Sequence, residues 1–293
     1  MMKGIILAAG KGTRLYPITL PVCKPLLPIY DKPLIYYPLG TLMSAGIRDI
    51  LIITQAEDRD DFARLLGDGS NLGVRISYAD QPVQRGIADA FIIGMDFIGD
   101  DSVCLALGDN IFYGPGFRRK LRQAASNKDG ASIFGYYVRD PRPFGVVEFD
   151  DDGNAISIEE KPRNPKSNYI VPGLYFYDNQ VVQIAQNIQP SARGELEITD
   201  VNNVYLENGK LKVVTLDEEF SWYDAGNADS LYEAAGAVKT AQRSGKYIGC
   251  VEEVAFMNRW ITVDDLRALG ENLKKTKYGE YLFSVVSDFE NRI

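Results

Sequence analysis

Residues 4–14 read GIILAAGKGTR, a short apolar run that leads directly into a glycine-rich turn. Such a turn after the first strand of a parallel sheet lets backbone N–H groups approach phosphate oxygens, and Arg14 adds charged donors. The stretch is not a dinucleotide fingerprint, because Leu15 stands at the third glycine position, and not a P-loop, because Gly12 follows the lysine. The residues therefore predict a phosphate-binding loop, with a surface turn whose glycines serve only geometry as the alternative.

Strand and helix patterns alternate beyond this loop, as they do in repeated βαβ units on a parallel sheet. Short β-branched runs predict strands at Gly4–Ala8, Ile50–Thr54, Val74–Tyr78 and Ser102–Leu107. Longer periodic segments predict helices at Pro33–Ala45 and Glu57–Leu66, each of which ends before a glycine. Pro38 lies inside the first predicted helix and is expected to kink it. This part of the chain is therefore predicted to be a parallel α/β unit.

The pattern changes after Asn110, where a hairpin interrupts the regular alternation. We predict a helix at Phe117–Ser126 and strands at Ala131–Val138, Val146–Phe149, Ile156–Glu160 and Tyr169–Tyr177, with an acidic hairpin turn at residues 150–154. Further helices are predicted near Val181–Asn187 and Glu197–Glu207, and the chain is mostly helical in pattern from Ala228 onward. The predicted organisation is a domain of residues 1–227, with halves at 1–110 and 111–227, and a helical region at 228–293.

The composition excludes several classes of chemistry and of partner. The chain of 293 residues has no histidine, which excludes His-based catalytic triads and zinc sites built on histidine. Its 32 Lys and Arg against 40 Asp and Glu give a net charge of −8, which argues against a nucleic acid or an anionic membrane as partner. Cys23, Cys104 and Cys250 are too few and too scattered for a disulfide framework and favour a reducing cytoplasm. No apolar run approaches the ~18 residues that suggest a membrane span.

Three charged residues, Lys24, Asp109 and Asp224, are candidates for phosphate and metal chemistry. Lys24 lies among prolines in PVCKPLLP (21–28), which stiffen the chain and present its ammonium group at a defined place. Asp109 follows the predicted strand that ends at Leu107, and α/β sheets bind ligands at the carboxyl ends of their parallel strands. Asp224 is a second such carboxylate, and two separated aspartates can share Mg²⁺. The alternatives are a solvated loop lysine and aspartates of ordinary turns or caps.

Residues 158–162 and 193–197 are candidates for binding a phosphorylated ligand. In IEEKP (158–162), strand alternation directs either Glu159 and Lys161 or Glu160 alone toward a cleft, unless the strand end is irregular. Arg193 is followed by two glutamates, so its guanidinium group either holds a phosphate or pairs with Glu195 or Glu197. The alternating tyrosines of the predicted strand 169–177 are more typical of core packing than of a sugar platform.

These local signals occur together in the order found in one family. The segments are GKGTR (10–14), KP (24–25), LGDN (107–110), EEKP (159–162), VPGLY (171–175) and DAG (224–226). Two longer strings, PIYDKPLIYYP (28–38) and SARGELEITD (191–200), are much more specific than a glycine motif. Over essentially its whole length the chain resembles the sugar-1-phosphate nucleotidyltransferases, in particular the members that join dTTP and glucose 1-phosphate.

The resemblance implies a fold, a cofactor and an assembly. The implied fold is a Rossmann-like α/β core with a mixed, mostly parallel sheet flanked by helices, followed by a sugar-binding hairpin region and a helical C-terminal part. Mg²⁺ is the implied cofactor, dTTP and glucose 1-phosphate are the implied substrates, and the usual assembly is a homotetramer. An oxygen of the sugar phosphate attacks the α-phosphorus in line and pyrophosphate leaves, a transfer that depends on alignment and charge neutralisation.

Matching the motifs residue by residue carries the family's site onto this sequence. The triphosphate is implied to bind Leu7, Ala9, Gly10, Gly12, Thr13, Arg14 and Lys24, and the base is implied to be read by Gln81 and Gly86. Asp109 and Asp224 are the implied Mg²⁺ ligands, and Asn110 is implied to contact both substrates. The sugar phosphate is implied to bind Gly145, Glu160, Lys161, Val171, Tyr175 and Arg193. The implied catalytic residues are Arg14, Lys24, Asp109, Lys161 and Asp224.

The sequence departs from the usual family pattern near both implied substrates. Pro25 stands where a glutamine is usual, Ala9 replaces a glycine and Phe144 replaces a tyrosine. The segments VQR (83–85) and DAGNA (224–228) and the residue Asp89 are also atypical. These departures leave the charged residues in place but keep UTP or another hexose 1-phosphate open as a substrate. A non-catalytic nucleotide-sugar sensor is the alternative from a different functional class.

Overall fold

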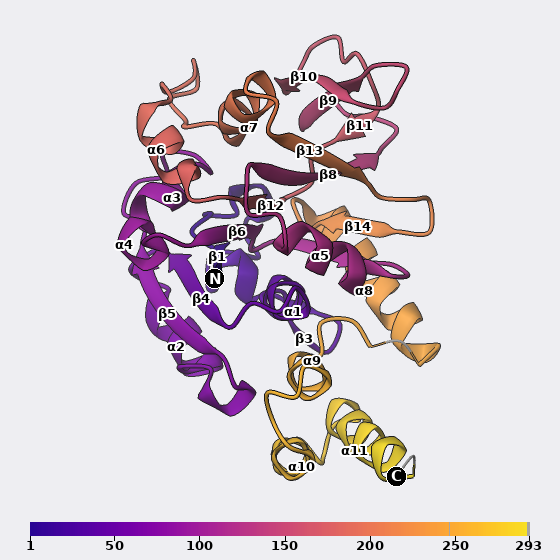
Figure 1. Cartoon of the computed structure of the whole chain (residues 1–293). Helices are drawn as coiled ribbons and strands as arrows, with labels where there is room; N and C mark the ends of the chain where they lie inside the picture. The colour runs from indigo at the N-terminus through magenta and orange to yellow at the C-terminus, as the bar shows by residue number, and fades with distance from the viewer. Residues whose placement is uncertain (246, 292–293) are drawn as a thin grey trace.

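Four parallel strands make up the N-terminal half of a large mixed sheet (Figure 1). The structure is a computed structural model that describes residues 1–245 and 247–291. The four strands are β1 (Met2–Leu7), β4 (Asp49–Thr54), β5 (Arg75–Asp80) and β6 (Ser102–Leu107), in the order β6-β1-β4-β5. All of their mutual pairings are parallel. The four predicted strands are confirmed.

Alternation of side chains along these strands supplies two hydrophobic layers, one on each face of the sheet. In β1, Ile5 and Ile6 are both fully buried but belong to opposite layers. The layer around Ile6 contains helices α1 (Tyr36–Ser44), α2 (Arg59–Leu66) and α5 (Phe117–Ala125). The layer around Ile5 contains α3 (Asp89–Ile93), α4 (Met95–Ile98), α6 (Gln180–Asn187) and α7 (Ile198–Glu207). The chain is therefore a mixed α/β structure with helices on both faces of its sheet, as predicted.

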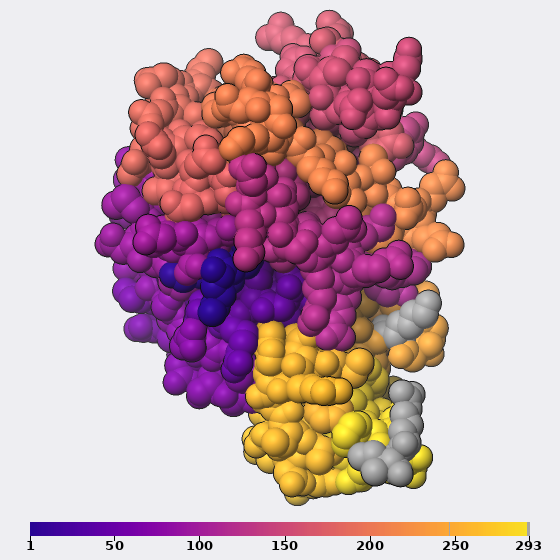
Figure 2. All heavy atoms as spheres, in the orientation of Figure 1, coloured from indigo at the N-terminus to yellow at the C-terminus, as the bar shows by residue number. Residues whose placement is uncertain are grey.

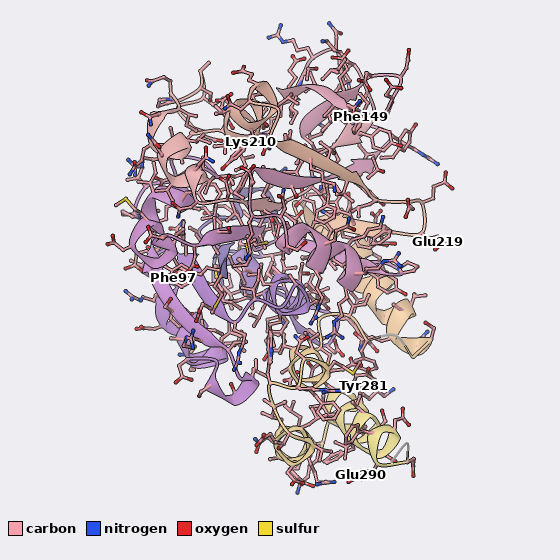
Figure 3. The ribbon with its side chains drawn as sticks, viewed as in Figure 1. Phe97, Phe149, Lys210, Glu219, Tyr281 and Glu290 are labelled. Atoms are coloured by element: carbon pink, nitrogen blue, oxygen red, sulfur yellow. The ribbon has the colours of Figure 1, made fainter. Side chains whose placement is uncertain are left out.

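Antiparallel strands extend the sheet beyond β6. β12 (Leu174–Tyr177) lies between β6 and β8 (Ala131–Tyr137), and β11 (Tyr169–Ile170), β9 (Gly145–Phe149) and β10 (Ala155–Glu160) follow. Phe149, labelled in Figure 3, lies at the end of β9 in the predicted hairpin. β13 (Leu211–Thr215), which the sequence did not predict, pairs in parallel with β8. The prediction of one continuous strand from Tyr169 to Tyr177 is wrong, because the chain turns at Pro172, whose carbonyl accepts a hydrogen bond from the N–H of Leu174.

The predicted kink at Pro38 is also corrected by the structure. Helix α1 begins at Tyr36, so Pro38 lies in its first turn, where a backbone N–H has no acceptor within the helix. The missing N–H of proline therefore interrupts no hydrogen bond, and α1 runs on to Ser44.

The chain from Ala228 onward is mostly helical, as predicted, with α8 (Ala228–Arg243), α9 (Val251–Met257), α10 (Val263–Asn272) and α11 (Lys277–Glu290). The last three form a lobe next to the N-terminal residues in Figure 2, and their apolar side chains share the hydrophobic layer of α1. Tyr281 of α11, labelled in Figure 3, stacks on Tyr247 with ring centroids 3.5 Å apart. Among the described residues, none of the helices is long and apolar enough to cross a membrane.

Short elements complete the fold near the ends of the parallel strands. β2 (Pro28–Ile29) and β3 (Lys32–Pro33) pair with each other, and 3-10 helices lie at Thr13–Leu15, Lys24–Leu26 and Ser70–Leu72. A separate antiparallel ribbon is formed by β7 (Asn110–Tyr113) and β14 (Ser221–Asp224). The sequence did not predict this ribbon, which joins two of the candidate site segments.

Candidate active site

The candidate site lies where the direction of the chain across the sheet reverses. The chain passes from β1 to β4 on one side, and it reaches β6 on the other side of β1 only after β5. Crevices that bind ligands in open α/β sheets lie outside the carboxyl ends of strands at such a reversal. Leu7 and Leu107 end the two strands, and the N–H of Gly108 donates to the carbonyl of Leu7 at 2.9 Å. The glycine-rich loop and Asp109 are therefore held side by side above one edge of the sheet.

A cavity of about 410 Å³ lies at this edge. It brings together many of the predicted site residues, namely Arg14, Asp109, Asn110, Gly145, Glu160, Lys161, Val171, Tyr175 and Asp224. Sequence analysis missed several further lining residues, including Ile87, Thr199, Asn202, Trp222 and Asn227. Trp222 packs edge to face against Phe144 at 5.3 Å between ring centroids. The cavity is thus lined by both aromatic and charged groups, a combination that suits a phosphorylated organic ligand.

The β7–β14 ribbon brings the two aspartates together. Asn110 and Asp224 are opposite each other in its register, and the N–H of Ala225 donates to the carbonyl of Asp109 at 3.1 Å. Both ends of the Asn110 amide form hydrogen bonds. Its oxygen accepts from Trp222 Nε1 at 2.6 Å and from the N–H of Gly173 at 3.3 Å, and its Nδ2 donates to Asp109 Oδ1 at 2.7 Å. The segments NIFY and SWYD are short, but their aromatic and β-branched residues were a signal for these strands.

Lys24 forms ion pairs with both carboxylates. It opens the 3-10 helix Lys24–Leu26, and its Nζ lies 2.5 Å from Asp109 Oδ2 and 3.8 Å from Asp224 Oδ1. Only 6% of Lys24 is exposed, so the alternative of a solvated loop lysine is wrong. The pairing of one buried ammonium group with two carboxylates leaves this part of the cavity with an excess of negative charge.

The electrostatic consequence of this arrangement is visible at Asp224. Burial and the negative charge of Asp109 raise the pKa of Asp224 to about 6, although Lys24 and Arg14 act in the opposite direction. A carboxyl group whose pKa is higher in the folded than in the unfolded chain stabilises the fold least when it is ionised. The folded chain therefore loses stability at this position as the pH rises from about 4, the ordinary pKa of aspartate, through about 6.

We expect Asp224→Asn to stabilise the protein at pH 8 in the presence of a chelator. The variant removes the ionised carboxylate, and the free energy of unfolding should rise by on the order of 2 kcal/mol. The gain should shrink toward zero at pH 4, because Asp224 is then protonated in the unaltered protein as well. Urea unfolding at both pH values measures the difference, with Asp217→Asn, which changes an exposed carboxylate, as the control. A variant less stable than the unaltered protein at pH 8 would contradict the prediction.

The end of β10 explains how two adjacent residues line the same cavity. Glu160 is the last residue of β10, and Lys161 has a φ of 45°, a left-handed conformation that breaks the alternation of the strand. Both Glu160 and Lys161 therefore line the cavity. The irregular strand end was one of the predicted possibilities. Glu160 is oriented by Thr199, whose hydroxyl donates to its Oε2 at 2.6 Å.

Arg193 does not line the cavity in the described structure. Its guanidinium group is held by Glu197, at 2.8 Å and 2.9 Å from Nη2 to the two carboxylate oxygens, and Nη2 lies 3.2 Å from Glu195. Glu160 lies 3.5 Å from the same nitrogen. Of the two possibilities for Arg193, the structure has the pairing with the following glutamates. Its contact with Glu160 places the guanidinium group beside the cavity, and phosphate binding by Arg193 stays a prediction.

Most of the residues predicted to meet the nucleotide lie in the segments that follow β1 and β5, and Asp109 and Asn110 come shortly after β6. The carbonyl of Ala9 accepts hydrogen bonds from Gln55 Nε2 and Gln84 Nε2, each at 2.7 Å. Gly86 has a φ of 105°, and a Cβ there would lie 2.5 Å from the carbonyl oxygen of Leu196, so only glycine fits this close approach. The loops after three neighbouring strands are therefore tied to one another around Ala9.

The thiol and phenol groups near the site are not poised for proton transfer. Burial, with the charge of Asp58 as a second cause, raises the pKa of Cys23 to about 12, which keeps the group a thiol at neutral pH. Burial also raises the pKa of Tyr175 well above its usual value. The remaining groups suited to chemistry are the carboxylates and the cationic side chains.

Comparison with known proteins shows the family to which the chain belongs. The family model described as nucleotidyl transferase matches residues 3–241. The glucose-1-phosphate thymidylyltransferase of Neisseria gonorrhoeae is 57% identical over 286 residues, which cover 97% of this chain and 99% of the relative. The enzyme of the same name from Mycolicibacterium smegmatis is 54% identical over 286 residues, with the same coverage.

A solved structure is similar over most of the chain. The crystal structure from Bacillus anthracis, assigned as a glucose-1-phosphate thymidylyltransferase in complex with sucrose, has a TM-score of 0.75 and 43% identity. The similarity covers 81% of this chain and 95% of that one. The match of the family model and the identity to relatives along nearly the full length establish that the chain belongs to the nucleotidyl transferase family, among its glucose-1-phosphate thymidylyltransferases.

Proposed function

We propose that the protein transfers the thymidylyl group of dTTP to glucose 1-phosphate, which yields dTDP-glucose and pyrophosphate. The observation that carries the proposal is Lys24, which is buried between Asp109 and Asp224 next to the cavity. Its ammonium group can attract a triphosphate, and the two carboxylates can bind a metal ion that does the same. The names of the relatives support the substrates. The retained cationic and acidic residues argue against a non-catalytic sensor.

The reaction needs little help with proton transfer. A phosphate oxygen of glucose 1-phosphate forms a bond to the α-phosphorus of dTTP, and the bond from that phosphorus to the bridging oxygen of pyrophosphate breaks. A phosphate monoester has a second pKa of about 6 and is largely ionised at neutral pH, so the nucleophile needs no general base. Alignment of the two phosphates and neutralisation of their charges are therefore the main contributions required of the protein. A chain without histidine can supply both.

The cationic side chains divide between the two substrates in this proposal. Arg14 and Lys24 hold the triphosphate, together with backbone groups of Leu7, Ala9, Gly10, Gly12 and Thr13. Lys161 and Arg193 hold the phosphate of the sugar, for which Arg193 must exchange part of its pairing with Glu197. Gly145, Glu160, Val171 and Tyr175 contact the sugar, Asn110 contacts both substrates, and Gln81 and Gly86 meet the base. The reacting phosphates then lie between positive groups that come from both halves of the chain.

The donor set near Lys24 fits a divalent cation. Within the described residues no group of three or more acidic or cysteine side chains is arranged to hold a metal ion. Asp109 and Asp224 supply hard oxygen ligands, and burial together with the negative charge of Asp109 raises the pKa of Asp224. Mg²⁺ favours this situation, because it binds through one or two carboxylates and takes its other ligands from substrate phosphates and water. Bound there, Mg²⁺ would neutralise charge on the transferring phosphate.

The proposal extends to the organisation of the chain. Residues 1–227 form the catalytic part, in which 1–110 bind the nucleotide and 111–227 bind the sugar phosphate, and 228–293 form a helical region. A homotetramer is the proposed assembly. A cytoplasmic location is supported by the three cysteines, which are all free and buried.

The decisive experiment measures pyrophosphate release over a matrix of nucleoside triphosphates and sugar 1-phosphates. We expect the highest kcat/KM for dTTP with glucose 1-phosphate and no turnover after removal of divalent cations. A preference for UTP or for another hexose phosphate would overturn the substrate assignment while leaving the reaction class. Absence of turnover with every pair, together with tight nucleotide-sugar binding, would support the sensor instead.

A further inference from the structure

Asp89 is a buried carboxylate beside the proposed nucleotide site, and the mechanism above does not use it. It is the first residue of α3 and only 1% exposed. Its Oδ1 accepts a hydrogen bond from Arg85 Nη2 at 2.7 Å, and its Oδ2 accepts one from Gln81 Nε2 at 3.0 Å. Arg85 is about half exposed, so the pair connects the surface to the interior. The carboxylate is thus shared by an arginine and by a glutamine side chain.

This contact determines which end of the Gln81 amide faces outward. An ionised carboxylate only accepts hydrogen bonds, so the NH₂ group of Gln81 must point toward Asp89 and its oxygen must point away. Residues 1–245 and 247–291 donate no hydrogen bond to Oε1 of Gln81. The fully buried side-chain atoms without a partner in this part of the chain belong to Thr54, Asp80 and Asn202, so Oε1 of Gln81 keeps some contact with solvent although the residue is only 4% exposed.

The free oxygen belongs to the edge of the sheet where the nucleotide loops meet. Gln81 directly follows β5, and its backbone N–H donates to the carbonyl of Thr54 at the end of β4. Gln84, three residues further on, reaches the carbonyl of Ala9 in the loop after β1. A hydrogen-bond acceptor of fixed orientation therefore stands at the position proposed for the base.

We propose that Asp89 is a positioning residue that sets the base specificity of this chain, an inference that rests on the proposed function. By holding the NH₂ group of Gln81, Asp89 leaves an acceptor for the base to meet. The ring N3–H of thymine or uracil satisfies this acceptor. Cytosine carries an unprotonated N3, whose lone pair faces the same oxygen without a hydrogen bond, and an unpaired buried polar group costs affinity. The site thereby discriminates thymine and uracil from cytosine.

Asp89→Asn tests the proposal because the new amide can also donate. It can bond to Oε1 of Gln81, so the Gln81 amide can turn and present its NH₂ group to the base. We expect the ratio of kcat/KM for dTTP to kcat/KM for dCTP to fall at least about tenfold, mostly through KM, with kcat for dTTP little changed. Calorimetric titration with dTTP and dCTP should show the same loss of discrimination in the dissociation constants.

Matched variants separate orientation from charge. Arg85→Gln keeps the carboxylate and should retain the preference for dTTP, and Asp80→Asn removes a neighbouring carboxylate that pairs with Arg59 and should retain it too. Gln81→Leu removes the amide that contacts the base, so its loss of discrimination between dTTP and dCTP should match that of Asp89→Asn. This variant tests the proposal if Asp89→Asn does not fold.

The possible outcomes keep this inference apart from the proposed function. An unaltered protein that neither binds nor uses dTTP would overturn both. An unaltered protein that uses dTTP, with an Asp89→Asn or Gln81→Leu variant whose dTTP to dCTP ratio is unchanged, would overturn this inference alone.

Discussion

We expect Asp109→Asn to lower kcat/KM for nucleotidyl transfer by roughly a thousandfold while the protein stays folded. Asp109 lies between Lys24 Nζ at 2.5 Å and Asn110 Nδ2 at 2.7 Å, so it accepts hydrogen bonds on both oxygens. The amide of Asn110 cannot turn, because its oxygen already accepts from Trp222 Nε1. An asparagine at position 109 offers only one oxygen, and its NH₂ group then faces either Lys24 or Asn110.

The substitution therefore removes a proposed metal ligand and also displaces the lysine that meets the triphosphate. Both effects act on charge near the α-phosphorus, where electrostatic stabilisation contributes most to such a transfer. Pyrophosphate release measures the loss, and circular dichroism with urea unfolding checks the fold. Asp217→Asn is the matched control, since it makes the same chemical change in an exposed ion pair with Lys120. Activity of Asp109→Asn within tenfold of the control would mean that Asp109 neither holds the metal nor positions Lys24.

Lys24→Met is expected to have an effect of similar size on turnover and a distinct effect on stability. The long apolar side chain fills the space of the lysine but leaves Asp109 and Asp224 facing each other without their cation. Removing one partner of a buried ion pair costs roughly 3–5 kcal/mol, so the variant should unfold at lower urea concentration in the presence of a chelator. Mg²⁺ should restore much of this stability, because it replaces the lost positive charge, but not the turnover.

The melting temperature with and without Mg²⁺, measured beside pyrophosphate release, distinguishes the two roles of Lys24. Lys210→Met is the matched control, because it breaks an exposed ion pair with Asp129, and neither residue lines the cavity (Lys210 is labelled in Figure 3). Its turnover and its response to Mg²⁺ should equal those of the unaltered protein. A Lys24→Met variant whose stability does not respond to Mg²⁺ would place the metal elsewhere.

Much of the fold could be predicted from the sequence because its signals are local. The apolar runs of β1, β4, β5 and β6 and the periodic helices after them depend on neighbouring residues only. The wrong predictions concern positions where a strand is interrupted or a helix begins. The run from Tyr169 to Tyr177 has the composition of a strand, but the backbone turns at Pro172. Pro38 is harmless because α1 begins only two residues before it.

The site was predictable in its residues but not in its contacts. The residue types of Lys24, Asp109, Glu160 and Lys161 suggested phosphate and metal chemistry without any structure. Their partners lie far away along the chain: Lys24 and Asp109 are 85 positions apart, and Trp222 and Asn110 are 112 positions apart. The short ribbon of β7 and β14 makes the contact of Trp222 with Asn110, and neither strand is long enough to show a clear alternation. The pairing of Arg193 with Glu197 could be named in advance as one of two possibilities, because it spans only four residues.

By itself, the sequence determined the alternation of strands and helices, the carboxyl-end position of Asp109, and a set of charged groups able to act without histidine. Only the tertiary structure decided that Lys24 is buried between two carboxylates, that Glu160 and Lys161 share one cavity, and that Asp89 orients the amide of Gln81. The physical reason is that propensity and periodicity are properties of adjacent residues. Electrostatic coupling and the orientation of an amide depend on distances between side chains, and those distances exist only after the sheet has brought distant strand ends together.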